Sequence, residues 1–148
     1  MCLIIDVNVA HRILINNNDP DFMQLRSALF GSRGPNARVA YGGKLKTELL
    51  KSETLRKALV QLDRAGRAKA VNDSEVERET KWVEDTGLCR SNDSHVIGLA
   101  RAANVRLLCS LDRDLHADFT NKTLIDKPRG KVYKNDAAHL PLLRKFCS

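Results

Sequence analysis

Two short apolar segments, each followed by acidic or hydroxyl side chains, constrain the fold of this chain most. Residues 2–5 (Cys-Leu-Ile-Ile) precede Asp6, and residues 105–109 (Val-Arg-Leu-Leu-Cys) precede Ser110 and Asp112. Runs that are apolar on both faces are typical of strands in a parallel sheet that is covered on both sides. Ligands of such folds bind at the carboxyl ends of the strands, near the reversal in strand order. The residues that follow these two segments are therefore candidates for a functional site.

Helical and strand-like patterns alternate along the rest of the chain. Asp19 and Pro20 predict a capped helix start. The predicted helices are 8–16, 20–30, 44–50, 53–65, 72–84, 94–103, 111–119 and 140–146, and the further short strands are 38–41, 69–71 and 123–125. This alternation predicts an α/β fold, a three-layer α/β/α sandwich around a mainly parallel central sheet. A length of 148 residues predicts a single domain over 1–148.

The charge of the chain is positive and uneven. The formal net charge is +7, and residues 119–148 hold seven Lys or Arg against two acids. This basic C-terminal extension, about residues 120–148, is compatible with a polyanionic partner such as nucleic acid. A solvated basic tail without a partner is the alternative interpretation.

The cysteines and the apolar runs bear on metal sites and on location. Cys2, Cys89, Cys109 and Cys147 are widely spaced, without a C-x-x-C pair or an adjacent His group, which disfavours structural zinc. No apolar run approaches the roughly 20 residues of a membrane helix, and no signal-peptide core precedes Asp6. We therefore expect a cytoplasmic protein with reduced thiols and no membrane partner.

Carboxylates occupy the positions where such a site would form. Asp6 and Asp112 follow the two apolar segments, Glu48 lies in a helix after a double glycine, Asp93 opens the helix 94–103, and Asp114 lies two residues beyond Asp112. Each also has a structural interpretation: Asp93 and Asp112 as helix caps, and Glu48 as a solvated helix residue. Asp6 is harder to explain in this way, because a buried carboxylate needs hydrogen-bond donors or a cation.

Carboxylates gathered at one sheet edge repel one another and raise each other's pKa values. A hard divalent cation such as Mg²⁺ or Mn²⁺ removes that repulsion and prefers oxygen ligands. A site of this kind can lower the pKa of a bound water and hold a phosphate oxygen. The acidic residues together therefore predict phosphodiester chemistry.

The arrangement resembles a PIN domain. The resemblance rests on Asp6 at the end of the first strand, Glu48 on a helix, the segment 91–100 (Ser-Asn-Asp-Ser-His-Val-Ile-Gly-Leu-Ala) and the segment 105–115 (Val-Arg-Leu-Leu-Cys-Ser-Leu-Asp-Arg-Asp-Leu). It covers nearly the whole chain, and it is most specific from residue 91 to residue 119. What it implies is a Mg²⁺- or Mn²⁺-dependent ribonuclease, similar to VapC-type toxins of toxin–antitoxin pairs, with a cognate antitoxin and a homodimer as expected partners.

The resemblance also assigns roles to individual residues. Asp6, Glu48, Asp93 and Asp112 match the acidic quartet, Asp114 matches an additional acid, and Ser110 matches a supporting hydroxyl residue. Asn8 departs from the small residues or Ser/Thr common in the family, although it can still contact water or phosphate. The long segment after residue 121 is also unlike the minimal toxins.

The expected reaction is hydrolysis of RNA. The metal ligands are expected to be Asp6, Asp93 and Asp112, joined by Asp114, with Glu48 holding a second ion or orienting the attacking water. The residues expected to bind the RNA backbone are Lys44, Lys46, Arg90, Arg113 and Arg129. No histidine is assigned to catalysis, and His95 is interpreted as a helix-face residue. One Trp, two Tyr and four Phe are too few for a large base-stacking platform, which favours structured RNA or an exposed loop as substrate.

Two other classes of function compete with this hypothesis. The first is a non-catalytic RNA- or protein-binding module in which the acids are only structural caps. The second is a phosphoryl-transfer enzyme of the haloacid dehalogenase or receiver type. The sequence Asp6-Val7-Asn8 disfavours this second class, because neither the Asp-x-Asp of the one nor the adjacent acids of the other are found there. A dinucleotide site is disfavoured because no G-x-G-x-x-G follows a strand.

Overall fold

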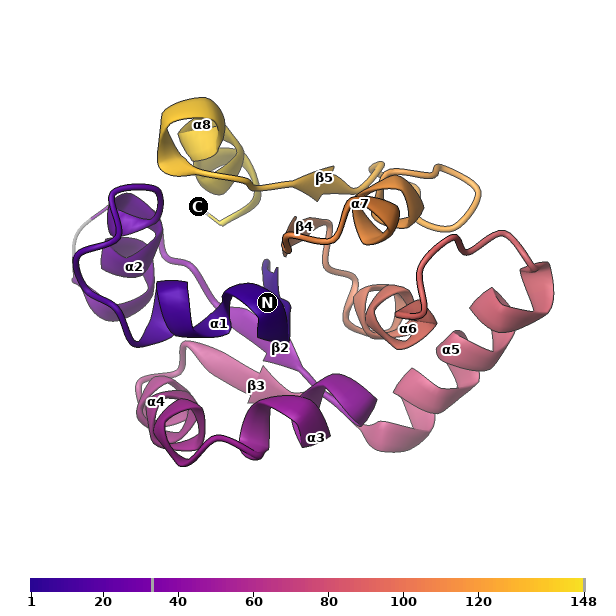
Figure 1. Cartoon of the computed structure of the whole chain (residues 1–148), viewed down its shortest axis with the longest axis horizontal. Helices are drawn as coiled ribbons and strands as arrows, with labels where there is room; N and C mark the ends of the chain where they lie inside the picture. The colour runs from indigo at the N-terminus through magenta and orange to yellow at the C-terminus, as the bar shows by residue number, and fades with distance from the viewer. Residues whose placement is uncertain (33, 148) are drawn as a thin grey trace.

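The computed structural model describes residues 1–32 and 34–147 and shows a mixed α/β fold with parallel strands (Figure 1). The elements in chain order are β1 (Ile4–Ile5), α1 (Val7–Leu14), α2 (Met23–Phe30), β2 (Val39–Tyr41), α3 (Gly43–Leu50), α4 (Glu53–Arg64), β3 (Ala68–Ala70), α5 (Asp73–Thr86), α6 (Ser94–Ala103), β4 (Leu107–Cys109), α7 (Arg113–Phe119), β5 (Lys131–Val132) and α8 (Asp136–Phe146). The predicted α/β class and parallel strands are confirmed.

The strands place the ends of β1 and β4 side by side. One parallel sheet has the order β1-β4-β5, and β2 pairs with β3 in parallel. A parallel bridge between Leu3 and Val39 connects the three-stranded sheet to the β2–β3 pair. The strand order across both is therefore β3-β2-β1-β4-β5. Ile5 pairs with Cys109, the last residue of β4. Because the strand order reverses between β1 and β4, their carboxyl ends form the position where open α/β sheets bind ligands.

Burial follows the apolar pattern of the sequence. The side chains of β1 and β4 are fully buried, and α6 buries a continuous series from His95 to Ala100. Helices α5 and α6 run side by side (Figure 1) and approach closely at Gly98. A Cβ at Gly98 would lie 2.1 Å from Thr80 Oγ1 and 2.7 Å from the Thr80 backbone. Only glycine therefore permits this packing.

One predicted helix start and one predicted strand are wrong in the segments 19–23 and 123–125. The helix predicted from residue 20 begins at Met23, because Asp19 is bound to Arg12 (Nε–Oδ2 2.7 Å) and its Oδ1 accepts the N–H of Asp21 in a turn. The strand predicted at 123–125 is a turn closed on the Asn121 carbonyl, and the strand lies instead at 131–132. In both places local polar side chains or backbone turns take the hydrogen bonds that the predicted element would need.

The basic C-terminal segment packs into the fold. Strand β5 pairs with β4, and α8, which begins at Asp136 instead of residue 140, packs against α2 and β4. The Asp136 carboxylate accepts the backbone N–H groups of Gln24 (2.7 Å) and Leu25 (3.2 Å) and the hydroxyl of Tyr133. Asp136 therefore caps α2, whose own N-cap residue, Phe22, has no side-chain acceptor.

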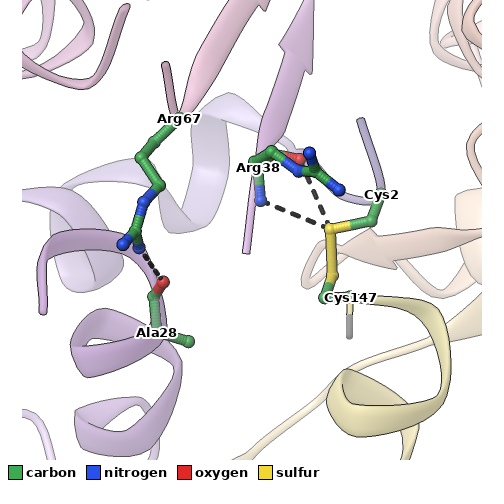
Figure 2. The surroundings of a disulfide bond; sticks show 5 residues. All are labelled: Cys2, Ala28, Arg38, Arg67 and Cys147. Atoms are coloured by element: carbon green, nitrogen blue, oxygen red, sulfur yellow. Dashed lines mark hydrogen bonds between the residues drawn. A yellow bond between two sulfur atoms is a disulfide. The ribbon is translucent and has the colours of Figure 1, made fainter. Parts of the chain in front are cut away.

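The expectation of reduced thiols is wrong for two of the four cysteines. Cys2 and Cys147 form a disulfide with a Cα–Cα distance of 5.5 Å across a sequence separation of 145 residues (Figure 2). Cys2 Sγ also accepts the N–H of Arg38 at 3.3 Å. Cys89 and Cys109 are free. Wide spacing in sequence concealed this pair, because only the packing of α8 brings the C-terminal segment to the start of β1.

In the part of the chain that the structure describes, no helix combines the length and the apolar character needed to cross a membrane.

Candidate functional site

Asp6 lies at the junction of β1 and β4. Its backbone N–H donates to the Cys109 carbonyl at 2.9 Å, which continues the strand ladder by one step. Its side chain is buried, with Oδ1 accepting the N–H of Val7 (2.8 Å) and Oδ2 accepting the Ser110 hydroxyl (2.8 Å). The carboxylate thus caps α1 and is held from both strand ends, so its orientation is fixed before any ligand binds.

Ser110 is the centre of a hydrogen-bond network at the end of β4. Its Oγ accepts the N–H of Asp112 (3.1 Å) and the side-chain amide of Asn8 (3.4 Å). Asn8 Oδ1 in turn accepts the N–H of Leu111 at 3.1 Å. His116 Nε2 lies 2.5 Å from the Ser110 carbonyl oxygen, which requires the Nε2–H tautomer. Asn8 therefore ties α1 to the segment after β4, and the segment is rigidly positioned.

Two further carboxylates act on Asp6. Burial raises the pKa of Asp6 above its usual value, and the negative charges of Asp93 and Glu48 raise this pKa further, while the Ser110 and Val7 hydrogen bonds oppose the rise. Glu48 lies on α3 and Asp93 immediately precedes α6. Glu48 and Asp93, from two elements that are distant in sequence, therefore lie near enough to the end of β1 for their charges to act on Asp6.

Asp93 and Asp112 differ in how their carboxylates are used. Asp93 occupies the N-cap position of α6 but its side chain makes no capping hydrogen bond. Asp112 Oδ1 caps α7 by accepting the N–H groups of Asp114 (2.9 Å) and Leu115 (3.3 Å). Asp114 is exposed in the first turn of α7. Helix capping therefore accounts for one carboxylate oxygen of Asp112. It accounts for neither oxygen of the Asp93 carboxylate.

His95 is a site residue that the sequence analysis missed. Its side chain is 9% exposed, and its Nε2 lies 3.5 Å from Glu48 Oε1. Burial lowers the pKa of His95, and the nearby Lys44 charge lowers it further, whereas Glu48 and Asp93 oppose this change. Its position within the inward-facing run of α6 was the available signal, because a polar ring among buried neighbours needs a polar partner.

A hollow of about 660 Å³ opens beside His95. It lies between the starts of α3 and α6 and one face of α5, and its polar lining includes Lys44, Thr47, Glu84 and Asn92. Asp6 does not line this hollow, so His95 and Lys44 connect the hollow to the carboxylates. A polar ligand in the hollow could thus reach the Glu48–His95 pair.

The five predicted RNA-binding cations are dispersed. Lys44 is exposed at the start of α3 beside His95, Lys46 is half-buried on the same helix, and Arg113 is exposed at the start of α7. Arg90 and Arg129 line a different hollow, of about 470 Å³. The structure therefore brings only Lys44 of this set next to the acidic residues.

Asp118 is a second residue that the sequence analysis missed. It is buried and accepts the N–H of Arg90 (2.8 Å), the N–H of Ser91 (3.0 Å) and the hydroxyl of Ser91 (2.7 Å). Ser91 Oγ accepts the N–H of Asp93 at 3.2 Å. Asp118 therefore holds the loop that carries Asp93, which makes it a positioning residue for the site.

The acidic side chains of the candidate site are of the kind that binds a hard divalent cation. Asp6, Glu48 and Asp93 offer carboxylate oxygens, which are the ligands that Mg²⁺ and Mn²⁺ prefer, and their mutual repulsion is what a cation would relieve. Within residues 1–32 and 34–147, no three His, Cys, Asp or Glu side chains already stand in a metal-ligating arrangement. Holding an ion would require these carboxylates to come closer together than the structure places them.

The chain matches no protein-family model, and no curated protein or solved structure shows significant similarity to it.

Proposed function

We propose that this chain is a Mg²⁺- or Mn²⁺-dependent ribonuclease of the PIN type that hydrolyses RNA phosphodiester bonds. The observation that carries the proposal is the buried Asp6 carboxylate, held by Ser110 at the reversal in strand order, with the charges of Glu48 and Asp93 acting on it. A buried carboxylate such as Asp6, with further negative charges nearby, is costly to keep ionised without a cation. Binding of a cation by these carboxylates would offset the free-energy cost of their negative charges.

RNA is the proposed substrate because of the charge of the chain. The formal net charge is +7, and the residues proposed to contact phosphates include Lys44, beside the acids, and the exposed Arg113. Lysine and arginine contacts to phosphates supply affinity that does not depend on base sequence. Lys46 on α3 is proposed to extend the same contacts.

The side chains proposed to hold the cation are Asp6 and Asp93, with Asp112 contributing Oδ2, which its capping bonds do not use. Asp114 is proposed as an outer, exposed acid. When bound, a divalent cation lowers the pKa of water and neutralises charge that develops on the phosphate. Ser110 fixes the Asp6 carboxylate, so that this ligand needs no reorientation.

Glu48 is proposed to act as the general base of the reaction, with His95 as its positioning residue. The attacking water forms a bond to phosphorus while the bond from phosphorus to the leaving oxygen breaks. Glu48 accepts a proton from that water, and the leaving oxygen takes a proton from solvent as the product ends separate. Neutral His95, at 3.5 Å from Glu48 Oε1, orients the Glu48 carboxylate.

Cleavage of a panel of structured and unstructured RNAs tests the proposal. We expect cleavage with Mn²⁺ or Mg²⁺, none with EDTA, and loss in both Asp6→Asn and Asp93→Asn proteins purified in parallel. Lys69→Gln, on the exposed edge strand β3, is the matched control and should retain activity. Cleavage that persists equally in both carboxylate variants would identify a contaminating nuclease and remove the support for the proposal.

The second candidate function is a non-catalytic RNA- or protein-binding module. The capping bonds of Asp112 and Asp6 favour it, because these carboxylates already have structural roles. It predicts that Mn²⁺ leaves the melting temperature unchanged, whereas a cation site predicts a rise.

The proposal includes the finer features that the resemblance implies. These are a three-layer α/β/α arrangement around the parallel strands, a toxin role with a cognate antitoxin, a homodimer, and a cytoplasmic location. Co-purification of a small partner protein and the mass of the complex in solution test the antitoxin and the homodimer.

A further inference from the structure

We propose that the hollow between the 88–91 loop, the end of α7 and the 120–130 segment is a separate phosphate-binding site, which anchors the RNA strand at a distance from the acidic residues. This hollow has a volume of about 470 Å³. Three cations that are distant in sequence line it, Arg90, Lys122 and Arg129. The inference rests on the proposed function, because it takes RNA as the substrate.

The three cations are available to a ligand. All three are exposed, and none forms an ion pair with any residue in 1–32 or 34–147. Arg129 donates its Nε to the Thr120 carbonyl, which fixes the guanidinium and leaves both Nη groups for a ligand. A guanidinium that is already held in place loses less side-chain entropy on binding a phosphate than a mobile guanidinium does.

The one acid in the lining, Asp118, offsets only part of the charge of the three cations. Asp118 is 2% exposed, and three hydrogen bonds from Arg90 N–H, Ser91 N–H and Ser91 Oγ occupy its carboxylate. Asn121 and Thr123 complete the lining with neutral amide and hydroxyl groups. The hollow therefore presents positive charge and hydrogen-bond donors, a combination that fits phosphate oxygens.

The location of the hollow suits a flanking part of the same RNA strand. Helix α7 begins next to Asp112 and ends at the hollow, and seven residues of helix span about 10 Å. The Asp118–Ser91–Asp93 hydrogen bonds also connect the hollow to the acidic residues. Since carboxylates repel a polyanion, binding energy must come from contacts away from the reacting phosphate, and this hollow supplies them.

The experiment measures binding of a fluorescein-labelled single-stranded RNA by anisotropy in EDTA over a series of salt concentrations, with probe integrity checked on a gel. Lys122→Glu and Arg90→Glu are the test variants. Lys69→Glu, on β3 at the opposite edge of the strands, is the matched control because it changes the net charge equally. Melting temperatures of all variants establish that each one folds.

We expect each test variant to weaken RNA binding about tenfold and to reduce the slope of log K against log salt by about one, whereas Lys69→Glu has a much smaller effect. Equal weakening by all three variants would show a net-charge effect only and would overturn the site. A polyglutamate peptide that competes with RNA in the wild type, but not in Lys122→Glu, would assign the hollow to an acidic protein and would also overturn it.

The binding measurement and the cleavage assay together separate this inference from the proposed function. Site-specific binding without any cleavage in Mn²⁺ would support the hollow and reject the nuclease. Cleavage with unaltered RNA affinity in Lys122→Glu and Arg90→Glu would support the nuclease and reject the hollow.

Discussion

The hydroxyl of Ser110 donates a 2.8 Å hydrogen bond to Oδ2 of Asp6 across the ends of β4 and β1. The two residues are 104 positions apart in sequence, and the pairing of Ile5 with Cys109 brings them together. The bond stabilises the ionised form of a buried carboxylate that its acidic neighbours destabilise. It therefore supports both the fold and the proposed ability of Asp6 to bind a cation.

Removal of this hydroxyl should weaken cation binding. In Ser110→Ala, the Asp6 carboxylate loses a donor that lowers its pKa, so the ionised form becomes less favourable. We expect Mn²⁺ affinity, measured by calorimetry, to fall about 10–100-fold, as for other residues that orient metal ligands. We expect the free energy of unfolding to fall by about 1–3 kcal/mol. Ser110→Thr should restore affinity; equal affinity in wild type and Ser110→Ala would contradict this role.

Asp6 should make the metal-free protein less stable as the pH rises. Its folded pKa lies above its usual value of 3.8, so the folded state binds the proton more tightly than the unfolded state. The free energy of unfolding therefore falls as the pH rises from that value through the raised pKa. Asp6→Asn should remove this slope and, at neutral pH in EDTA, raise the melting temperature by about 2–4 °C, which corresponds to about 1 kcal/mol at this length. Urea denaturation at several pH values gives the slope, and identical slopes in both proteins would reject the prediction.

His95 should produce the opposite dependence at higher pH. Burial lowers its folded pKa below 6.5, so the unfolded state binds the proton more tightly. Its neutral form contributes stability above pH 6.5, and this contribution is lost as the pH falls from 6.5 through the lowered pKa. NMR titration of the His95 ring should show the lowered pKa directly. A pKa of 6.5 or above for His95 would contradict the prediction that burial favours its neutral form.

Reduction of the Cys2–Cys147 disulfide should destabilise the protein. The bond closes nearly the whole chain into a loop, and loss of such a constraint costs about 2–5 kcal/mol. At this length, that cost lowers the melting temperature by roughly 5–15 °C. A reductant should produce this shift in the wild type and in Cys89→Ser, which removes a free thiol, but not in Cys147→Ser. Four alkylatable thiols in the protein denatured without reductant would contradict the pairing.

Gly98→Ala should separate α5 from α6. The new Cβ would lie 2.1 Å from Thr80 Oγ1 and 2.7 Å from Thr80 N and Cα, so the helices must move apart. We expect a loss of about 1–3 kcal/mol in the free energy of unfolding. Thr80→Ala alone should be nearly neutral, because its buried hydroxyl has no partner among the described residues, and it should reduce the cost of Gly98→Ala only in part. Additive effects of the two substitutions would contradict this contact.

The elements near the candidate site were predictable where one local pattern dominated. The apolar run before Asp6 predicted β1, and the spacing of apolar residues after Asp93 predicted α6 with its observed bounds, 94–103. In both places the side chains that the sequence marks as apolar are the ones that the fold buries. The turn at 19–22 could not be predicted in this way, because the Arg12–Asp19 ion pair, which joins two segments, replaces the helix start.

The sequence by itself determined the α/β class, the two buried strands and the acids that follow them, because burial periodicity and strand-end polarity are local properties of the chain. Only the tertiary structure decided that Glu48 and Asp93 act on Asp6, that His95 contacts Glu48, and that Cys2 reaches Cys147. These relationships depend on the order of the strands and on the packing of α3, α6 and α8, which bring together residues that no sequence spacing connects.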